Sequence, residues 1–310
     1  MAGSKPVAMM KKRERTKKQP RAKIGGGLYI VATPIGNADD ITLRALATLE
    51  QADLIACEDT RVTGKLLAFY GIAARKTPYH EHNAARAGPV LLRHLERGQA
   101  VALVSDAGTP LISDPGYRLV NACHDAGIPV TVIPGASAPI AALAVSGLPS
   151  DRFLFAGFLP VKPAARRKTL KELSSVRATL VLFESPRRLA ASLGDMAAVL
   201  GHRQAAVARE LTKFFEEVRR DTLEELARHY REAGPPKGEV VIVVAPPEKS
   251  AVPADAVDID ARLGAALETL GVRDAAAKVA AATGVSKREL YSRALALTGR
   301  GGRAAGRKAP

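Results

Sequence analysis

Short apolar stretches that stop at small and polar residues recur along this chain. The central one, Ala100–Val104, runs into the segment Ser105–Gly116, which holds two Ser-Asp pairs, two glycines and two prolines. Glycine permits close approach of a ligand and proline fixes φ, so this segment predicts a pre-shaped loop after a buried strand. Ligands of open α/β sheets bind beyond the carboxyl ends of strands, which makes the loop a candidate site. An ordinary strand-to-helix turn is the alternative for either Ser-Asp pair alone.

The pattern repeats with amphipathic segments between the apolar ones, which predicts an α/β fold with a parallel sheet. Either Asp39 or Asp40 is expected to cap the first helix. Each polar cluster follows a strand, so all clusters should lie on one edge of the sheet. The expected strands are 28–32, 52–57, 77–79, 100–104 and 130–133, and the expected later helices are 65–70, 86–97 and 117–126.

From Asp151 the alternation restarts, and the final part of the chain is wholly helical. Ser286 and Glu289 have the spacing of a capping box, at the second helix of a helix-turn-helix pattern. Expected strands of the second part are 153–157, 178–183, 205–208 and 240–245, with helices at 187–200, 222–233, 259–270, 274–282 and 287–297. The expected domains are a basic disordered arm (1–26), two α/β domains (27–148 and 149–248), a helical domain (249–298) and a basic tail (299–310).

Most of the net charge of +15 lies in the two ends of the chain. Residues 1–23 carry nine Lys/Arg against one Glu, and residues 299–310 carry four Lys/Arg and no acid, which leaves +3 for the rest. Basic tails are typical of arms that touch a polyanion, or of tails that only maintain solubility. The charge therefore favours a nucleic-acid partner without identifying it.

Several classes of site are absent from the sequence. The two cysteines, Cys57 and Cys123, lack CxxC spacing, and no metal-ligand spacing, Walker A motif or GxSxG motif occurs. We expect no metal and a reducing, cytoplasmic location. The uncharged stretch 128–150 is broken by four prolines and two glycines, so it is not expected to span a membrane, and no secretory signal is visible.

Five motifs, in order, resemble the tetrapyrrole methylase superfamily, and most closely its branch that methylates small-subunit ribosomal RNA. These motifs are Thr33–Asn37, Glu58–Arg61, Ser105–Gly116, Val132–Ala138 and Ala208–Lys213. The helical end of the chain also resembles the helix-turn-helix extension of that branch, whereas the basic N-terminal arm is not part of the pattern. The resemblance covers residue 28 to the last helix, and it implies two α/β domains with a cofactor cleft between them.

The resemblance further implies S-adenosylmethionine as cofactor, a homodimer, and 2′-O-methylation of a cytidine in the decoding centre of 16S rRNA. The cofactor residues that it implies are Pro34, Ile35, Gly36, Asp106, Ala107, Gly108, Thr109, Ser137, Ala138, Phe183 and Ala208. Basic positions offer contacts to RNA phosphates, with solvated helix ends as the plain alternative. These RNA-binding candidates are Arg61, Arg166, Arg167, Lys168, Arg188, Lys287 and Arg288.

A ribose hydroxyl becomes a good nucleophile when a base takes its proton or a cation stabilises its anion. The candidate catalytic residues beside the expected cleft are Lys213, Glu184, Asp59, Glu210 and His82. Structural roles are open for some of them, since Glu210 can pair with Arg209 and Asp59 can cap a helix. Three other functions stay open: a tetrapyrrole methyltransferase, a protein side-chain methylase and a non-catalytic nucleic-acid-binding protein.

Overall fold

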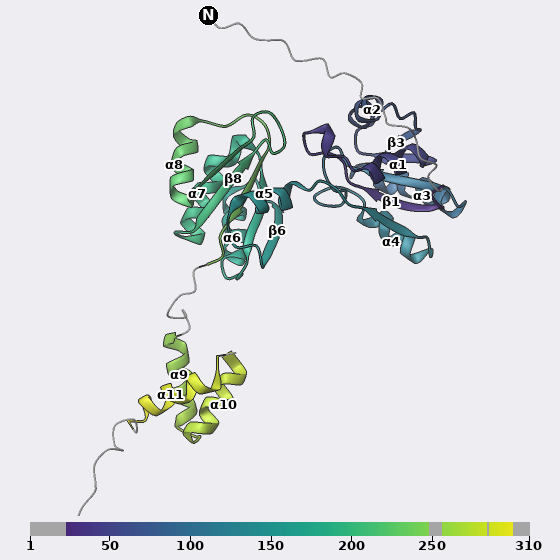
Figure 1. Ribbon diagram of the computed structural model, residues 1–310. Coiled ribbons are helices and arrows are strands. Elements are labelled where there is room, and N and C mark those ends of the chain that lie inside the picture. Colours follow the sequence, from purple (N-terminus) through teal and green to yellow (C-terminus); the bar gives the residue numbers. More distant parts are fainter. Residues whose placement is uncertain (1–22, 248–255, 284, 300–310) are drawn as a thin grey trace, which may run out of the picture. The chain divides into compact units, whose positions relative to one another are not determined.

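The computed structural model describes residues 23–247, 256–283 and 285–299. The chain divides into two compact units, one ending at Pro247 and the other beginning at Glu248 (Figure 1). The expected basic arm up to residue 22, residues 248–255 and the tail from residue 300 lie outside the described residues.

The first sheet is entirely parallel, as expected, with strand order β3-β2-β4-β1-β5. Every residue of the central strand β4 is at most 3% exposed, because β1 and β2 flank it and helices cover both faces. All carboxyl ends of these strands share one edge, which confirms the predicted convergence of the polar clusters. The strands are β1 (Gly27–Val31), β2 (Leu54–Cys57), β3 (Lys76–Pro78), β4 (Ala100–Val104) and β5 (Val130–Ile133).

Alternate residues of these strands pack into two separate hydrophobic layers, one on each face of the sheet. Leu103 belongs to one layer and Val104 to the other. The expected cap of the first helix was wrong: Asp39 and Asp40 form a short 3-10 helix, and the Thr42 hydroxyl instead accepts a hydrogen bond from the Ala45 amide. The elements are η1 (Ala38–Asp40), α1 (Leu43–Gln51), α2 (Thr60–Phe69), α3 (Ala84–Glu96) and α4 (Tyr117–Asp125).

The second sheet is mixed, in contrast to the first, with strand order β6-β7-β10-β8-β9. Strand β10 is antiparallel to both β7 and β8, so the carboxyl ends of β7 and β8 lie on the same edge, beside the start of β10. The edge strand β9 is missing from the sequence prediction. The strands are β6 (Phe153–Phe158), β7 (Thr179–Glu184), β8 (Gln204–Arg209), β9 (Glu217–Thr222) and β10 (Val240–Val244).

The two faces of the second sheet are covered by different parts of the chain. One face packs on α6, α7 and α8, and the last two are neighbours in Figure 1. The other packs on α5 through Ala142 and Leu143, and Ile35 from the loop after β1 joins the same hydrophobic cluster. The elements are α5 (Ala138–Ser146), α6 (Pro163–Leu173), η2 (Pro186–Arg188), α7 (Leu189–Leu200) and α8 (Leu223–Ala233).

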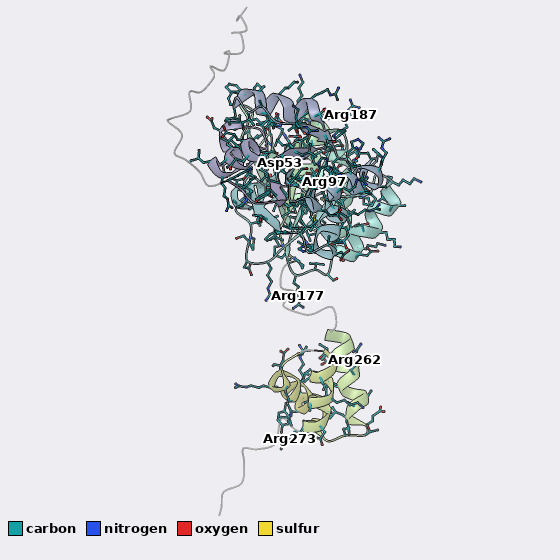
Figure 2. All side chains as sticks on the ribbon, turned by 90° about the vertical axis from the view of Figure 1, so that its right-hand side faces the viewer. Asp53, Arg97, Arg177, Arg187, Arg262 and Arg273 are labelled. Atoms are coloured by element: carbon teal, nitrogen blue, oxygen red, sulfur yellow. The ribbon has the colours of Figure 1, made fainter. Side chains whose placement is uncertain are left out.

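The described residues of the second unit form a bundle of three helices, α9 (Ala256–Leu267), α10 (Val272–Thr283) and α11 (Lys287–Leu297). Its core is aliphatic and includes Leu263 and Leu290, both 0% exposed. The Ser286 hydroxyl accepts a hydrogen bond from the Glu289 amide at 3.2 Å, which confirms the predicted helix start. Figure 2 labels two exposed arginines of this unit, Arg262 on α9 and Arg273 on α10.

Candidate functional site

A cavity of about 430 Å³ lies where the loops at the carboxyl edge of the first sheet meet the second sheet. The first sheet contributes the loops after β1, β4 and β5, and the second contributes the ends of β7 and β8 and the start of β10. Small-molecule sites typically measure ~300–1,000 Å³, so this volume suits a single small ligand. The expected cofactor residues that line the cavity are Ile35, Asp106, Ala107, Gly108, Thr109, Ser137, Ala138, Phe183 and Ala208.

The other two expected cofactor residues, Pro34 and Gly36, line a neighbouring cavity of about 380 Å³, together with Lys213. A Cβ placed on Gly36 would stand 2.5 Å from Lys213 Cγ and 3.0 Å from the Leu211 carbonyl oxygen. Only a residue without a side chain fits there. The glycine therefore allows the loop after β1 to touch the loop after β8, and together they separate the two cavities.

Backbone strain is concentrated in two loops that line these cavities. Among the described residues, the non-glycine positions with positive φ are Leu111 (74°), Ser113 (65°), Glu210 (50°) and Thr212 (65°). The first two follow β4 and the last two follow β8. Such conformations cost on the order of 1–3 kcal/mol each and typically mark functional loops. The two loops are thus held in defined shapes by the structure around them.

Every charged side chain that lines the larger cavity is acidic. Two of these carboxylates are paired: Arg188 lies 2.5 Å from Glu184, and Lys213 lies 2.7 Å from Glu239. The other two have no basic partner among the described residues. The four acids are Asp106, Asp114, Glu184 and Glu239. The cavity consequently favours a ligand with positive charge.

Asp114 is the acid in this cavity whose ionisation is most altered. Its pKa is raised to about 6, chiefly by burial and further by the carboxylates of Glu58 and Asp106, against a hydrogen bond from Ser105 that lowers it. Such a carboxylate changes charge just below neutral pH, where proton acceptors are effective. Sequence reasoning marked the Ser113-Asp114 pair as part of a site but did not include Asp114 among the catalytic candidates.

Lys213 and Glu210, two of those candidates, bind each other. Lys213 Nζ lies 2.8 Å from Glu210 Oε1 and 2.7 Å from Glu239 Oε2. Burial alone would lower the pKa of Lys213, but these two hydrogen bonds outweigh burial and raise it. The hydrogen bond from Lys213 also lowers the pKa of Glu210. Lys213 is therefore a fixed cation. The alternative in which Glu210 pairs with Arg209 is not observed, because Arg209 pairs with Glu217 instead, at 3.0 Å.

The remaining catalytic candidates are distributed differently. Glu184 lines the cavity but is 3% exposed, and it accepts hydrogen bonds from Arg188, Ser192 and its neighbouring amide. Asp59 caps α2, and hydrogen bonds from Arg61 lower its pKa to about 2. His82 is exposed and lines neither of these two cavities.

The basic candidates for RNA contact fall into two groups. Arg61 and Arg167 have side chains that are 86% and 58% exposed, and Lys168, Lys287 and Arg288 are exposed as well. These five positions are accessible to a polyanion.

Two other basic candidates serve the fold. The Arg166 side chain is 5% exposed, and its Nε donates to Asp195 Oδ2 at 2.7 Å. In contrast to the expectation, Arg166 is therefore not accessible to RNA. Arg188 is 22% exposed and donates to Glu184 and to the Leu159 carbonyl oxygen. Both guanidinium groups are already occupied.

Within residues 23–247, 256–283 and 285–299, no helix has the length and apolar character needed to cross a bilayer. Over the same residues, no group of three or more His, Cys, Asp or Glu is placed to hold a metal ion.

Comparison with known proteins places the chain in a family. The family model of Tetrapyrrole (Corrin/Porphyrin) Methylases matches residues 27–227, and that of the RsmI C-terminal HTH domain matches residues 253–298. Among solved structures, uroporphyrin-III-C-methyltransferase from Thermus thermophilus is 26% identical, with a TM-score of 0.52 over 71% of this chain and 94% of its own. Diphthine synthase has a TM-score of 0.55 at 18% identity, over 70% of this chain and 89% of its own.

Two curated relatives are much more similar in sequence, and both are named ribosomal RNA small subunit methyltransferase I. The protein from Mesorhizobium japonicum is 57% identical over 279 residues, which is 90% of this chain and 94% of its own length. The protein from Escherichia coli O157:H7 is 48% identical over 274 residues, or 87% of this chain and 95% of its own. The chain belongs to the tetrapyrrole methylase superfamily and, within it, to the ribosomal RNA small subunit methyltransferase I family.

Proposed function

We propose that this protein uses S-adenosylmethionine to methylate the 2′-hydroxyl of a cytidine ribose in the decoding centre of 16S rRNA. The observation that carries the cofactor assignment is the acidic lining of the larger cavity, in which Asp106 and Asp114 have no basic partner among the described residues. A sulfonium cofactor is positively charged, so this lining complements it. The rRNA substrate is supported by the names of the curated relatives.

The residues of the larger cavity fit the parts of this cofactor. S-adenosylmethionine, when bound, supplies an electrophilic methyl group. Phe183, Ala208 and Val241 form an apolar wall suited to a planar base, and Thr109 and Ser137 stand on the opposite loops. The Thr109 hydroxyl donates to the Ala136 carbonyl at 3.0 Å, which fixes the loop after β4 against the loop after β5. The chain thereby presents a shaped cavity before any ligand arrives, and orientation supplies much of the rate of a methyl transfer.

The ionisable groups on the two sides of the cavity are suited to different tasks. Asp114 Oδ is suited to hold a proton released from a substrate hydroxyl, because its pKa is raised to about 6. Lys213 stays protonated beside the loop after β1 and binds both Glu210 and Glu239. We propose a homodimer in the cytoplasm as the working form, in line with the resemblance to the family.

The test is transfer of labelled methyl from S-adenosylmethionine to small ribosomal subunits taken from a strain that lacks this gene. A 2′-O-methyl group blocks alkaline cleavage at one phosphodiester, so hydrolysis maps the product. One resistant cytidine in the decoding region is the expected result. Cofactor binding without label in RNA would move the assignment to a tetrapyrrole or another acceptor. Absence of cofactor binding would overturn the enzymatic assignment.

A further inference from the structure

Two adjacent phenylalanines project from the loop between β8 and β9. Phe214 is 94% exposed, the highest value among the large exposed hydrophobic side chains of the described residues, and Phe215 is 66% exposed. Their rings meet edge to face, with centroids 5.0 Å apart and planes at 89°. Neither ring belongs to a hydrophobic cluster of the described core. The protein thus exposes two rings to solvent at one point, and we refer to Phe214 and Phe215 as the aromatic tip.

The loop that carries the aromatic tip is braced by its own hydrogen bonds. The Lys213 amide donates to the Glu210 carbonyl at 3.0 Å, and the Glu216 amide donates to the Lys213 carbonyl at 3.1 Å. The Glu216 carboxylate accepts from the Thr212 amide at 2.6 Å. Because the backbone is already fixed, a partner that stacks on the rings loses little conformational entropy in ordering them.

The aromatic tip is next to the residues that line both cavities. Leu211 lines the larger cavity, and Lys213 lines the neighbouring one. Lys213 is also the residue against which Gly36 packs. The aromatic tip therefore follows directly in sequence after residues that line the two cavities.

Most charges around the aromatic tip are paired. Lys213 binds both Glu210 and Glu239, and Glu217 pairs with Arg209 at 3.0 Å and with Arg219 at 3.2 Å. Glu216 is the acid of this loop without an ion pair among the described residues, and its carboxylate is held by the Thr212 amide. The loop consequently does not present a row of unpaired negative charges to a polyanion. The Arg219 side chain is 42% exposed, and it lies two residues after Glu217, to which it binds.

The size of the aromatic tip selects among possible partners. A stable protein–protein interface buries about 800 Å² on each side, more than two phenylalanine side chains supply. A nucleobase, in contrast, needs only one ring face, and base–aromatic stacking is tolerant of base identity. Proteins that recognise unpaired RNA nucleotides use exposed aromatic side chains in this way.

We propose that the aromatic tip stacks one ring face, supported by the edge-to-face contact with the second ring, on an unpaired base of the RNA substrate, next to the nucleotide whose ribose enters the larger cavity. This inference rests on the proposed function, since it requires an RNA substrate. The stacked base would hold the strand splayed at the cavity and so position the target ribose. Phe214 and Phe215 act here as binding and positioning residues, and they take no part in bond making.

The test measures RNA binding without turnover, in the full-length F214A/F215A double variant. Loss of stacking, worth about 1–3 kcal/mol per base, predicts about 5- to 150-fold weaker binding to small ribosomal subunits. The affinity for S-adenosylmethionine, measured by calorimetry, should be unchanged. The matched control is L43A, which removes an apolar side chain that is 74% exposed on α1, and it should bind RNA normally.

A second variant gives a direct signal of stacking. F214W keeps an aromatic face, so it should retain RNA affinity, and its fluorescence should be quenched when the RNA binds. The wild-type chain contains no tryptophan, so this signal has no background.

Three results would overturn the inference. Normal RNA affinity of F214A/F215A would overturn the inference about the aromatic tip and leave the proposed function intact. A shift of the double variant from dimer to monomer in sedimentation would assign the rings to a second copy of the chain. Failure of the wild-type chain itself to bind the RNA would overturn the proposed substrate and this inference together, whereas cofactor binding would report separately on the cavity.

Discussion

The amide nitrogen of Asn37 lies 3.0 Å from the Thr212 hydroxyl oxygen, and this hydrogen bond joins loops 175 residues apart in sequence. Asn37 follows β1 in the first sheet, and Thr212 follows β8 in the second. Thr212 makes this contact from a left-handed backbone conformation, with a φ of 65°. The two α/β parts are therefore connected directly at the wall between the two cavities.

Removal of the Thr212 hydroxyl should loosen this connection. T212V deletes one hydrogen bond worth about 1 kcal/mol, so we expect roughly 5-fold weaker binding of S-adenosylmethionine, measured by calorimetry. G36A should be more severe, because its methyl group would clash with Lys213 and Leu211. As a control, G264A changes a glycine of α9 that has open space around it. Equal cofactor affinity of T212V and wild type would show that the bond does not support the cavity.

Replacement of Asp114 should change how stability depends on pH. Its pKa is raised from 3.8 to about 6, so the folded state holds the proton more tightly than the unfolded state does. Stability from this group is thus complete below about pH 4 and is lost as pH rises through 6. The free energy of unfolding of wild type, measured in urea, should fall relative to that of D114N over this window. Two curves that stay parallel from pH 4 to pH 7 would contradict the assignment.

Substitutions in the cluster of Arg166, Arg167 and Asp195 should distinguish an arginine that stabilises the fold from one that is accessible to RNA. Asp195 is 9% exposed at its side chain and binds Arg166, which is 5% exposed, and Arg167, which is 58% exposed. Breaking a buried ion pair costs about 3–5 kcal/mol when the remaining charge has no other partner. Because Arg167 still binds Asp195 in R166M, this variant should lower the free energy of unfolding by up to that amount.

The exposed member of this cluster provides the comparison. R167M should cost less than about 1 kcal/mol, while any loss of RNA affinity should appear in R167M and not in folded R166M. Urea denaturation and RNA binding are measured on both variants. Similar stability losses in the two would refute the distinction.

Both cysteines should be unreactive in the folded protein. Cys57 and Cys123 are 0% exposed, and burial raises the pKa of both thiols, that of Cys123 to about 11. The thiolate is the reactive form. Neither thiol should react with a disulfide reagent at neutral pH until denaturant is added. Rapid labelling of the native chain would show local opening around β2 or α4.

The first sheet could be predicted from the sequence because its strands are buried on both sides. Apolar runs such as Ala100–Val104 then appear without interruption, and the strand boundaries follow from the polar clusters after them. The position of the candidate cavity follows from the same pattern, since parallel strands bring their carboxyl ends together. The cavity lining from Asp106 to Thr109 illustrates this.

Other features depend on contacts that sequence patterns do not reveal. Strand β9 reads Glu-Val-Arg-Arg-Asp-Thr, and such a polar segment becomes a strand only because it pairs along β8 at the sheet edge. Arg166 looked like part of a basic patch, but it lies one helical turn before Leu170, which is 0% exposed, and so shares the buried face of α6. That spacing was a usable signal.

The position of β10 has a consequence for how the chain folds during its synthesis on the ribosome. β10 is the last strand of the first unit to be synthesised, yet it is inserted between β7 and β8 at the centre of the second sheet. Until residues 240–244 leave the exit tunnel, the earlier strands have no central partner and their edges stay unpaired. The first sheet, complete by residue 133, can assemble much earlier. Nascent chains should therefore pass through a stage in which the first α/β half is folded, while the second cannot complete its sheet because β10 has not yet been synthesised.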